Sequence, residues 1–162
     1  MGKASALQRE IRQSVPFRSR AQEGTIGLLR SADVVRRFLA HIVEPHGITL
    51  QQYNVLRILR GAGDKGIPTL DIVERMLEQA PGITRLLDRL EAKKLVRRKR
   101  STRDRRQVLC WITAAGLELL ARLDEPFLGA DGSALGELSP REVRALIRIL
   151  DKGRAGHALI SN

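Results

Sequence analysis

The stretch that decides the fold is residues 83–113, which read ITRLLDRLEAKKLVRRKRSTRDRRQVLCWIT. After Leu95 the pattern fits two strands around a polar tip at 101–104. The second strand, 107–112, is rich in the β-branched and aromatic residues that favour strands. Before the strands, apolar residues recur at the three- and four-residue steps of an amphipathic helix: Ile83, Leu86, Leu87 and Leu90. The sequence therefore predicts a helix followed directly by a basic β-hairpin.

Three further helices are predicted ahead of this stretch. A long helix should span about 21–44, where apolar residues keep helical spacing until Pro45 ends it. The next helix opens with Thr49-Leu-Gln-Gln52, a capping box that satisfies free backbone N–H groups at both ends of the box. Thr69 is expected to cap a short third helix, and Pro81 suits the first turn of the helix after it.

Two helices are predicted after the hairpin. Thr113 should cap the first, which we expect to end near residue 126 and to be followed by a glycine-containing loop. Ser139-Pro-Arg-Glu142 is a capping box with proline in the first turn, so it should open the last helix.

A short helix, a second helix and a hairpin in this order form a winged helix-turn-helix. We therefore expect a mainly α protein with a small β-hairpin wing. In this motif the second helix enters the major groove of DNA and contacts base edges from its N-terminal turn, where free N–H groups also attract phosphate. The alternative is that the exposed face of this helix is simply its solvated side. The candidate DNA-binding residues are Thr69, Gly82, Thr84, Arg85, Arg89, Arg98, Arg103, Arg105 and Arg106.

The net charge of +11 is concentrated in two segments. Residues 93–106 hold nine basic side chains and one acidic side chain, and residues 1–20 hold five basic and one acidic. Such clustering beside a helix-turn-helix indicates a polyanionic partner, namely double-stranded DNA. The excess of arginine near the hairpin tip suits a narrow minor groove, because guanidinium is planar and weakly hydrated. A hairpin whose charges are only solvated remains the alternative.

Other classes of protein find little support in the sequence. It has no phosphate-binding glycine loop, zinc-protease helix or nucleophile elbow, so we expect no enzyme activity, no cofactor and no metal site. The single cysteine, Cys110, fits inert packing better than redox sensing, because apolar burial raises the pKa of a thiol. There is no apolar signal region and no apolar run long enough to span a bilayer, so a cytoplasmic location is expected.

The motifs of this chain, taken in order, resemble those of the MarR-type transcription regulators, and the likeness covers about Thr25 to Leu123. The resemblance implies an obligate homodimer that presents one winged helix lobe per subunit to a pseudo-palindromic DNA site. It also implies that Arg106 enters the minor groove and that Asp104 holds the wing in shape through an ion pair. The motifs are Gln52-Tyr-Asn-Val-Leu-Arg57, Ile83-Thr-Arg-Leu-Leu-Asp-Arg-Leu-Glu91, Leu95-Val-Arg-Arg98, Asp104-Arg-Arg106, and Ile112-Thr113 followed by Gly116.

The polar, basic composition of 1–20 and the resemblance together assign regions to the chain. A flexible basic arm is expected first, then a single domain, then a C-terminal tail. The expected bounds are 1–20 for the arm, 21–156 for the domain, and 157–162 for the tail; within the domain, about 48–113 form the winged helix lobe, and about 21–44, 114–126 and 139–154 form the dimerisation helices.

Two functions remain open at this point. The first is a homodimeric, sequence-specific regulator of transcription, namely a repressor that a small molecule releases from DNA. In this family the small molecule is often an aromatic acid, and the sequence does not identify the residues that would bind it. The second is a winged helix that serves only protein interaction or dimerisation, because fold alone does not fix function. Replacing Arg105 and Arg106 with alanine separates the two, since only the first function depends on these charges.

Overall fold

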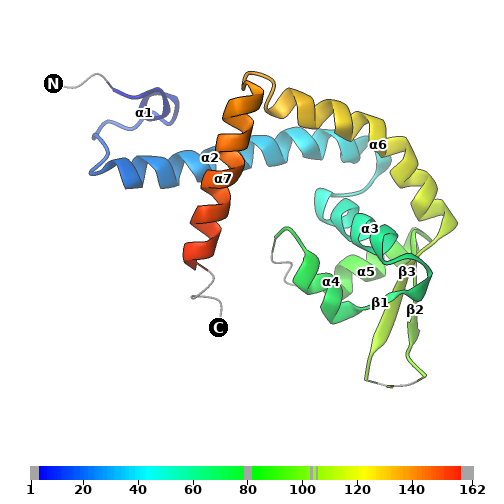
Figure 1. The fold of residues 1–162 in the computed structure, drawn as a ribbon. Helices are drawn as coiled ribbons and strands as arrows, with labels where there is room; N and C mark the ends of the chain where they lie inside the picture. The colour runs from blue at the N-terminus through cyan, green and yellow to red at the C-terminus, as the bar shows by residue number, and fades with distance from the viewer. Residues whose placement is uncertain (1–3, 79–81, 103, 105, 158–162) are drawn as a thin grey trace.

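The computed structural model describes residues 4–78, 82–102, 104 and 106–157. A lobe of short helices and a small sheet lies below two long helices, α2 and α6, and the hairpin β2–β3 projects from the lobe away from them (Figure 1). The protein is thus mainly α with a β-hairpin wing, as predicted. Its elements are α1 (Ala6–Glu10), α2 (Arg20–Val43), η1 (Glu44–His46), α3 (Leu50–Ala62), η2 (Gly63–Lys65), β1 (Ile67–Pro68), α4 (Thr69–Arg75), α5 (Ile83–Ala92), β2 (Val96–Arg100), β3 (Val108–Ile112), α6 (Ala114–Ala134) and α7 (Pro140–His157).

The core lies where α3 meets α5, α6 and the sheet. It is almost entirely aliphatic, as the low aromatic content of 3% requires. Burying one such side chain stabilises the fold by roughly 1.5–3 kcal/mol, so a core shared by the lobe and the long helices joins the two firmly. The most deeply buried side chains are Val43, Val55, Leu56, Leu59, Ile72, Leu87, Leu90, Cys110, Leu120 and Leu123.

The sheet has three antiparallel strands in the order β1-β3-β2. In the wing, Arg97 pairs with Trp111 and Arg98 pairs with Cys110, so the two strands of the hairpin are in the register that the predicted tip allows. Strand β1 was not predicted, because its two residues are too few to show a periodicity.

Most of the predicted helix starts are confirmed. Helix α2 begins one residue earlier than expected, and α3 begins with the predicted capping box, in which the Gln52 N–H donates to Thr49 Oγ1 at 3.2 Å and the Thr49 N–H donates to Gln52 Oε1 at 3.0 Å. The Ser139 N–H donates to Glu142 Oε2 at 2.8 Å, and the Glu142 N–H donates to Ser139 Oγ at 3.4 Å. These boxes fix where α3 and α7 begin.

The prediction that the helix after the wing ends near residue 126 is wrong, because α6 continues to Ala134. Pro126 and two glycines disfavour a helix locally. Phe127 and Ala130 are nevertheless buried, with exposed fractions of 8% and 5%, and this packing outweighs the local preference. The helix expected over 114–126 is therefore longer than its sequence predicts.

Two further expectations need correction. Thr69 does not cap α4: Pro68 holds the cap position, and the Thr69 hydroxyl donates instead to the carbonyl of Val108 at 3.3 Å. The N-terminal arm contains the short helix α1, which Glu10 ties to α2 through an ion pair with Arg30 at 2.8 Å. The prediction for Pro81 and most of the expected C-terminal tail lie outside the described residues. None of the helices in the described ranges is long and apolar enough to cross a membrane.

Candidate nucleic-acid interface

Helix α5 presents one face to the core and the other to solvent. Leu87 and Leu90 are buried, whereas Thr84, Arg85 and Arg89 lie on the outer face, as the spacing of the sequence predicts. This outer face therefore offers two guanidinium groups and a hydroxyl, which can donate to phosphates and base edges.

Gly82 occupies the N-cap position of α5 with a φ of 91°. This left-handed conformation favours glycine, because a side chain there would be strained. Among the described residues nothing lies within 4 Å of the position where a Cβ would be, so the glycine meets a demand of the backbone rather than of packing. No side chain of the described residues caps the helix, and its first N–H groups are left available to a partner.

A polar hollow of about 220 Å³ separates the N-terminus of α5 from that of α3. Arg85 and Arg89 line it from α5, and Thr49 and Gln51 line it from α3. The N-terminal ends of two helices and two arginines thus meet at one place, and each contributes positive potential. The sequence did not single out Thr49 or Gln51 for this role, because their nearness to α5 follows only from the packing.

The outer face of the wing is basic and carries one large aromatic ring. The Arg97 guanidinium lies over the ring of Trp111, 4.3 Å from its centre, and Trp111 Nε1 donates to the carbonyl of Asp64 at 3.0 Å. Trp111 therefore fastens the wing to η2. Lys99 and Arg100 lie further along β2 and are exposed toward the tip.

The tip of the wing is closed by hydrogen bonds around Asp104. Its Oδ1 accepts from the backbone N–H of Arg106 at 2.9 Å, and its own N–H donates to Ser101 Oγ at 3.3 Å. Asp104 thus shapes the turn through the backbone, and the side chain of Arg106 is exposed. Arg103 and Arg105, the other two arginines expected to contact DNA here, lie outside the described residues.

Arg98 is turned back from β2 toward α5 instead of outward. Its N–H and Nε donate to Glu91 at 3.1 and 3.0 Å, and its Nη2 donates to Glu91 Oε2 and Asp88 Oδ1, each at 2.6 Å. These hydrogen bonds raise the pKa of Arg98 above its already high value, so it stays charged. Of the predicted DNA-binding residues, Arg98 and Thr69 therefore have partners within the lobe.

Cys110 is fully buried beside Thr69. Burial raises the pKa of its thiol, which keeps the sulfur protonated at neutral pH. No cluster of three metal-binding side chains occurs among the residues that the structure describes.

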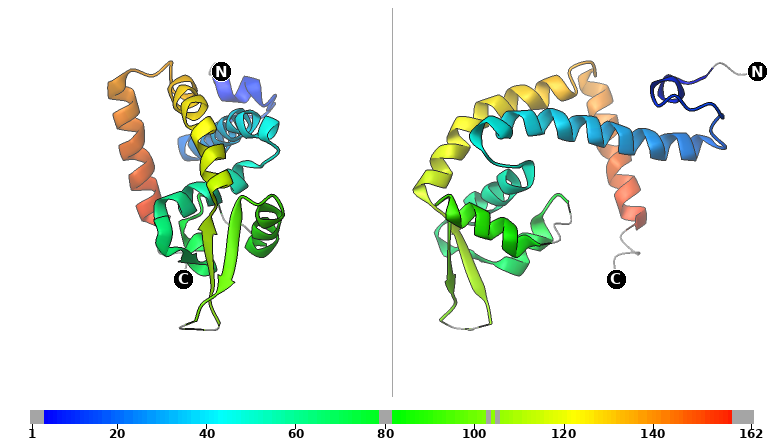
Figure 2. Two further views of the ribbon diagram at one scale, coloured as in Figure 1. Left: turned by 90° about the vertical axis from the view of Figure 1, so that its right-hand side faces the viewer. Right: turned by 180° about the vertical axis from the view of Figure 1, so that it is seen from behind.

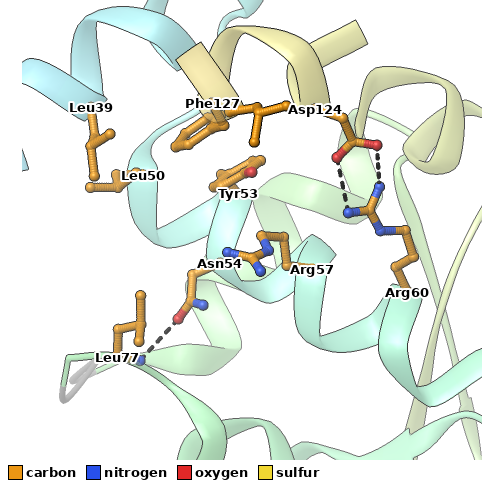
Figure 3. Close-up of a pocket in the computed structure, with 10 residues that line it drawn as sticks. Leu39, Leu50, Tyr53, Asn54, Arg57, Arg60, Leu77, Asp124 and Phe127 are labelled. Atoms are coloured by element: carbon orange, nitrogen blue, oxygen red, sulfur yellow. Dashed lines mark hydrogen bonds and ion pairs between the residues drawn. The ribbon is translucent and has the colours of Figure 1, made fainter. Parts of the chain in front are cut away.

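A second hollow, of about 340 Å³, lies between the lobe and the long helices (Figure 3). Its walls are mostly apolar and come from α2, α3, the segment after α4, and α6, and the stacked rings of Tyr53 and Phe127 close one side. Arg60 binds both oxygens of Asp124 at 2.8 and 2.9 Å, which lowers the pKa of that carboxyl group. The lining residues are Leu39, Leu50, Tyr53, Asn54, Arg57, Arg60, Leu77, Asp124, Phe127 and Leu128.

Arg57 differs from Arg60 in that no carboxylate among the described residues lies within 4.0 Å of its guanidinium. Its cation lies 6.0 Å from the centre of the Tyr53 ring, at the side of the hollow. Sequence reasoning missed this site. The spacing of Tyr53 and Arg57, four residues apart, places them on one helical face, but it does not show that Phe127 and Leu77 lie opposite.

The hollow reaches the segment that leads to α5. The N–H of Leu77 donates to Asn54 Oδ1 at 3.0 Å (Figure 3). One residue further along this segment, Glu78 pairs with Arg36 of α2 at 2.5 Å. A molecule that entered the hollow would therefore touch Leu77 and Asn54, which position the turn of the helix-turn-helix just before α5.

The order of elements, the exposed face of α5 and the basic hairpin together define a winged helix protein. The model of the MarR family matches residues 46–107. The Escherichia coli O157:H7 transcriptional regulator HosA is 30% identical over 105 residues, which cover 65% of this chain and 76% of HosA. The chain therefore belongs to the MarR family. The homoprotocatechuate degradative operon repressor of Escherichia coli is 26% identical over 79% of this chain and 85% of that protein.

Solved structures agree with this assignment. A MarR transcription factor from Planctomyces limnophilus is 39% identical and superposes with a TM-score of 0.66, covering 83% of this chain and 98% of its own. Bordetella bronchiseptica BpsR, whose DNA binding is regulated by 6-hydroxynicotinic acid, is 26% identical with a TM-score of 0.72, over 82% and 98% of the two chains.

Proposed function

We propose that this MarR-family regulator acts as a homodimer that binds a pseudo-palindromic duplex through α5 and the wing, represses transcription there, and is released by a small aromatic acid. The observation that carries the proposal is that Arg85, Arg89 and Arg106 are exposed on α5 and the wing, with no carboxylate partner in the described part of the chain. Because its DNA partner is in the cytoplasm, we infer the same location for the protein.

The basic groups of α5 and the wing fit two adjacent grooves. Arg85 and Arg89 stand on the recognition helix, whose width suits a major groove. Arg106 stands at the tip of the hairpin, from which its exposed side chain could enter a narrow minor groove. No carboxylate lies within 4.0 Å of these three guanidinium groups in the described part of the chain, so none has to be displaced by phosphate. The second function, protein interaction alone, does not explain why these cations are exposed together on the recognition helix and the wing.

The dimer is supported by apolar surface on the long helices. Helix α7 descends from the end of α6 and does not lie along another helix in any of the three views (Figures 1 and 2). Ile147 and Ile149 on α7 are 54% and 61% exposed, and Leu28 and Leu29 on α2 are 54% and 67% exposed. Exposed apolar side chains on these long helices favour an interaction surface, and a second copy of the chain would bury the same faces symmetrically.

The proposed effector fits the hollow beneath Tyr53 and Phe127. An aromatic ring would contact Leu39, Leu50 and Leu77, and its carboxylate would pair with Arg57. A ligand changes a conformational equilibrium only by its different affinity for the two states. We propose that the bound acid favours a state in which Leu77 and the start of α5 have moved, so that the two lobes no longer match the operator.

Salt titration of binding to a selected duplex tests the DNA-binding part of the proposal. If the dimer makes about 6–10 phosphate contacts, the affinity should fall by roughly 10³–10⁵ between 50 and 200 mM salt. Light scattering on the same samples should report a dimer, free and bound. An affinity that does not change with salt would contradict the proposal, and so would a monomer that binds the duplex as tightly as the proposed dimer should.

A further inference from the structure

The contacts of Arg98 set it apart from the other basic residues of the interface. Two carboxylates of α5 hold its guanidinium and leave its side chain 21% exposed. Such charge-assisted bonds are short and strong, and the Nε and Nη2 atoms both take part. To reach a phosphate, Arg98 would have to give up these bonds and leave two like-charged carboxylates beside the DNA.

The connection between α5 and β2 is short and fixed at its base. Only residues 93–95 lie between the two elements, and Lys94 turns the chain with a φ of 60°. The Leu95 N–H donates to the carbonyl of Leu90 at 3.0 Å, and Thr113 Oγ1 donates to the carbonyl of Lys94 at 2.7 Å. A Cβ on Gly116 would come within 2.4 Å of the Leu95 carbonyl oxygen, so α6 also packs directly against this turn.

Beyond that base, Arg98 bridges the strand to the helix. Asp88 and Glu91 lie on successive turns of α5, and both contact the Arg98 guanidinium. Asp88 is the one that lies on the exposed face of the helix. The bridge therefore constrains the angle at which the wing leaves the recognition helix. It also neutralises Asp88, whose carboxylate is 53% exposed beside the groups that would face phosphate.

We propose that Arg98 is a positioning residue and not a DNA contact: with Asp88 and Glu91 it fixes the angle between recognition helix and wing, and so the distance between the major-groove and minor-groove positions that one subunit recognises. This inference rests on the proposed function. It predicts that the operator preference of the wing depends on a residue that does not touch the operator.

Two substitutions, at Arg98 and at Glu91, give opposite results depending on whether Arg98 is a positioning residue or a DNA contact. Arg98→Lys keeps the positive charge but loses the planar, bidentate geometry of the guanidinium. A phosphate contact would survive this change, whereas the brace, by which we mean the bridge from Arg98 to Asp88 and Glu91, would not. Glu91→Gln removes a negative charge near DNA, which would strengthen binding by electrostatics alone, whereas loss of the brace would weaken it. Glu74→Gln is the matched control, because Glu74 is an exposed acid on α4 outside the brace.

The measurement is the affinity of each variant for a library of duplex sites at fixed salt, normalised to the active fraction of protein. We expect Arg98→Lys and Glu91→Gln each to weaken binding to the preferred site roughly tenfold. Base preference at the wing positions should flatten, while preference at the recognition-helix positions is kept. The double variant should be no worse than either single variant, because both remove the same bridge. A variant that was merely less stable would lose affinity for all sites equally.

Wild-type affinity and preference in Arg98→Lys, or tighter binding in Glu91→Gln than in Glu74→Gln, would overturn the proposal. Hydrogen exchange without DNA separates this failure from failure of the proposed function. Amides of 96–100 should exchange faster in both brace variants than in the wild type or in Glu74→Gln. Unchanged exchange would overturn the brace even if the wild type bound no duplex.

Discussion

The rings of Tyr53 and Phe127 lie face to face, with centroids 4.0 Å apart and planes inclined by 7°. Tyr53 belongs to α3 in the lobe, and Phe127 belongs to α6 among the long helices. The pair therefore joins the region that we expect to bind DNA to the region that we expect to form the dimer. It also closes the hollow proposed for the effector, so binding there can act on both regions at once.

Removal of the Phe127 ring should destabilise the protein strongly. Phe127→Ala deletes a buried ring together with its stacking on Tyr53, and we expect a decrease of about 3–5 kcal/mol in the free energy of unfolding. Leu117→Ala on the same helix is the control, because Leu117 is 44% exposed and should cost far less. Denaturant unfolding at one protomer concentration measures both, since the stability of a dimer depends on concentration. Equal decreases in the two variants would contradict the packing described.

Arg106 and Arg85 should contribute differently to DNA binding. Arg106→Ala should weaken binding evenly across A·T-rich sites and lower the salt slope by about one for each phosphate that the protein no longer neutralises. Arg85→Ala should cost about 1–3 kcal/mol and relax the preference at one base position. A site library read for both variants makes the comparison. If the two profiles were the same, the division between a minor-groove contact by Arg106 and base reading by Arg85 would be wrong.

Arg57 should govern the response to an aromatic acid without affecting DNA binding in its absence. Arg57→Gln removes the cation beside Tyr53, so the acid has no charged partner there while α5 and the wing are untouched. Operator affinity should match the wild type without ligand, and a phenolic or benzoic acid that releases the wild type should fail to release the variant. Release of both at the same concentration would place the effector elsewhere.

Cys110 should make stability fall at alkaline pH. Burial raises the pKa of its thiol, so the folded state keeps the proton while the unfolded chain releases it above about pH 8.5. The folded state then binds more protons than the unfolded state, and stability declines as the pH rises, by up to about 1.4 kcal/mol per unit. Unfolding measured from pH 7 to 10 should show this decline, and Cys110→Ala should show less of it. The same decline in both proteins would assign it to other groups.

The native thiol should also be slow to react. A thiol-specific disulfide reagent at pH 7 should modify Cys110 only as fast as the protein opens, and rapidly once it is unfolded. Rapid modification of the folded protein would favour a redox role for this cysteine over the packing role.

The local pattern of the sequence was enough to predict what depends on local physics. The capping boxes at Thr49 and Ser139, the apolar face of α5 and the strand alternation in the wing all appear at their predicted places. The likeness to a known family was also sound. These features are encoded within a few residues, where spacing and capping chemistry act directly.

Features that depend on contacts between distant residues could not be predicted in this way. The extension of α6 past Pro126 depends on the burial of Phe127 against Tyr53, which lies more than 70 positions earlier. Thr69 bonds to Val108 across the sheet, and Arg98 looks like one more arginine in a basic run until α5 is folded beside it. The predicted DNA contacts at Arg85, Arg89 and Arg106 stay predictions until a complex is measured.

The sharpest test of DNA recognition by a symmetric dimer is selection of bound sites from random duplex DNA. We expect enrichment of an inverted repeat whose half-sites are centred about one helical turn, roughly 34 Å, apart, with A·T-rich positions where the wings reach the minor groove. Recovery of unrelated sequences at low ionic strength, or of single half-sites bound by a monomer, would contradict it.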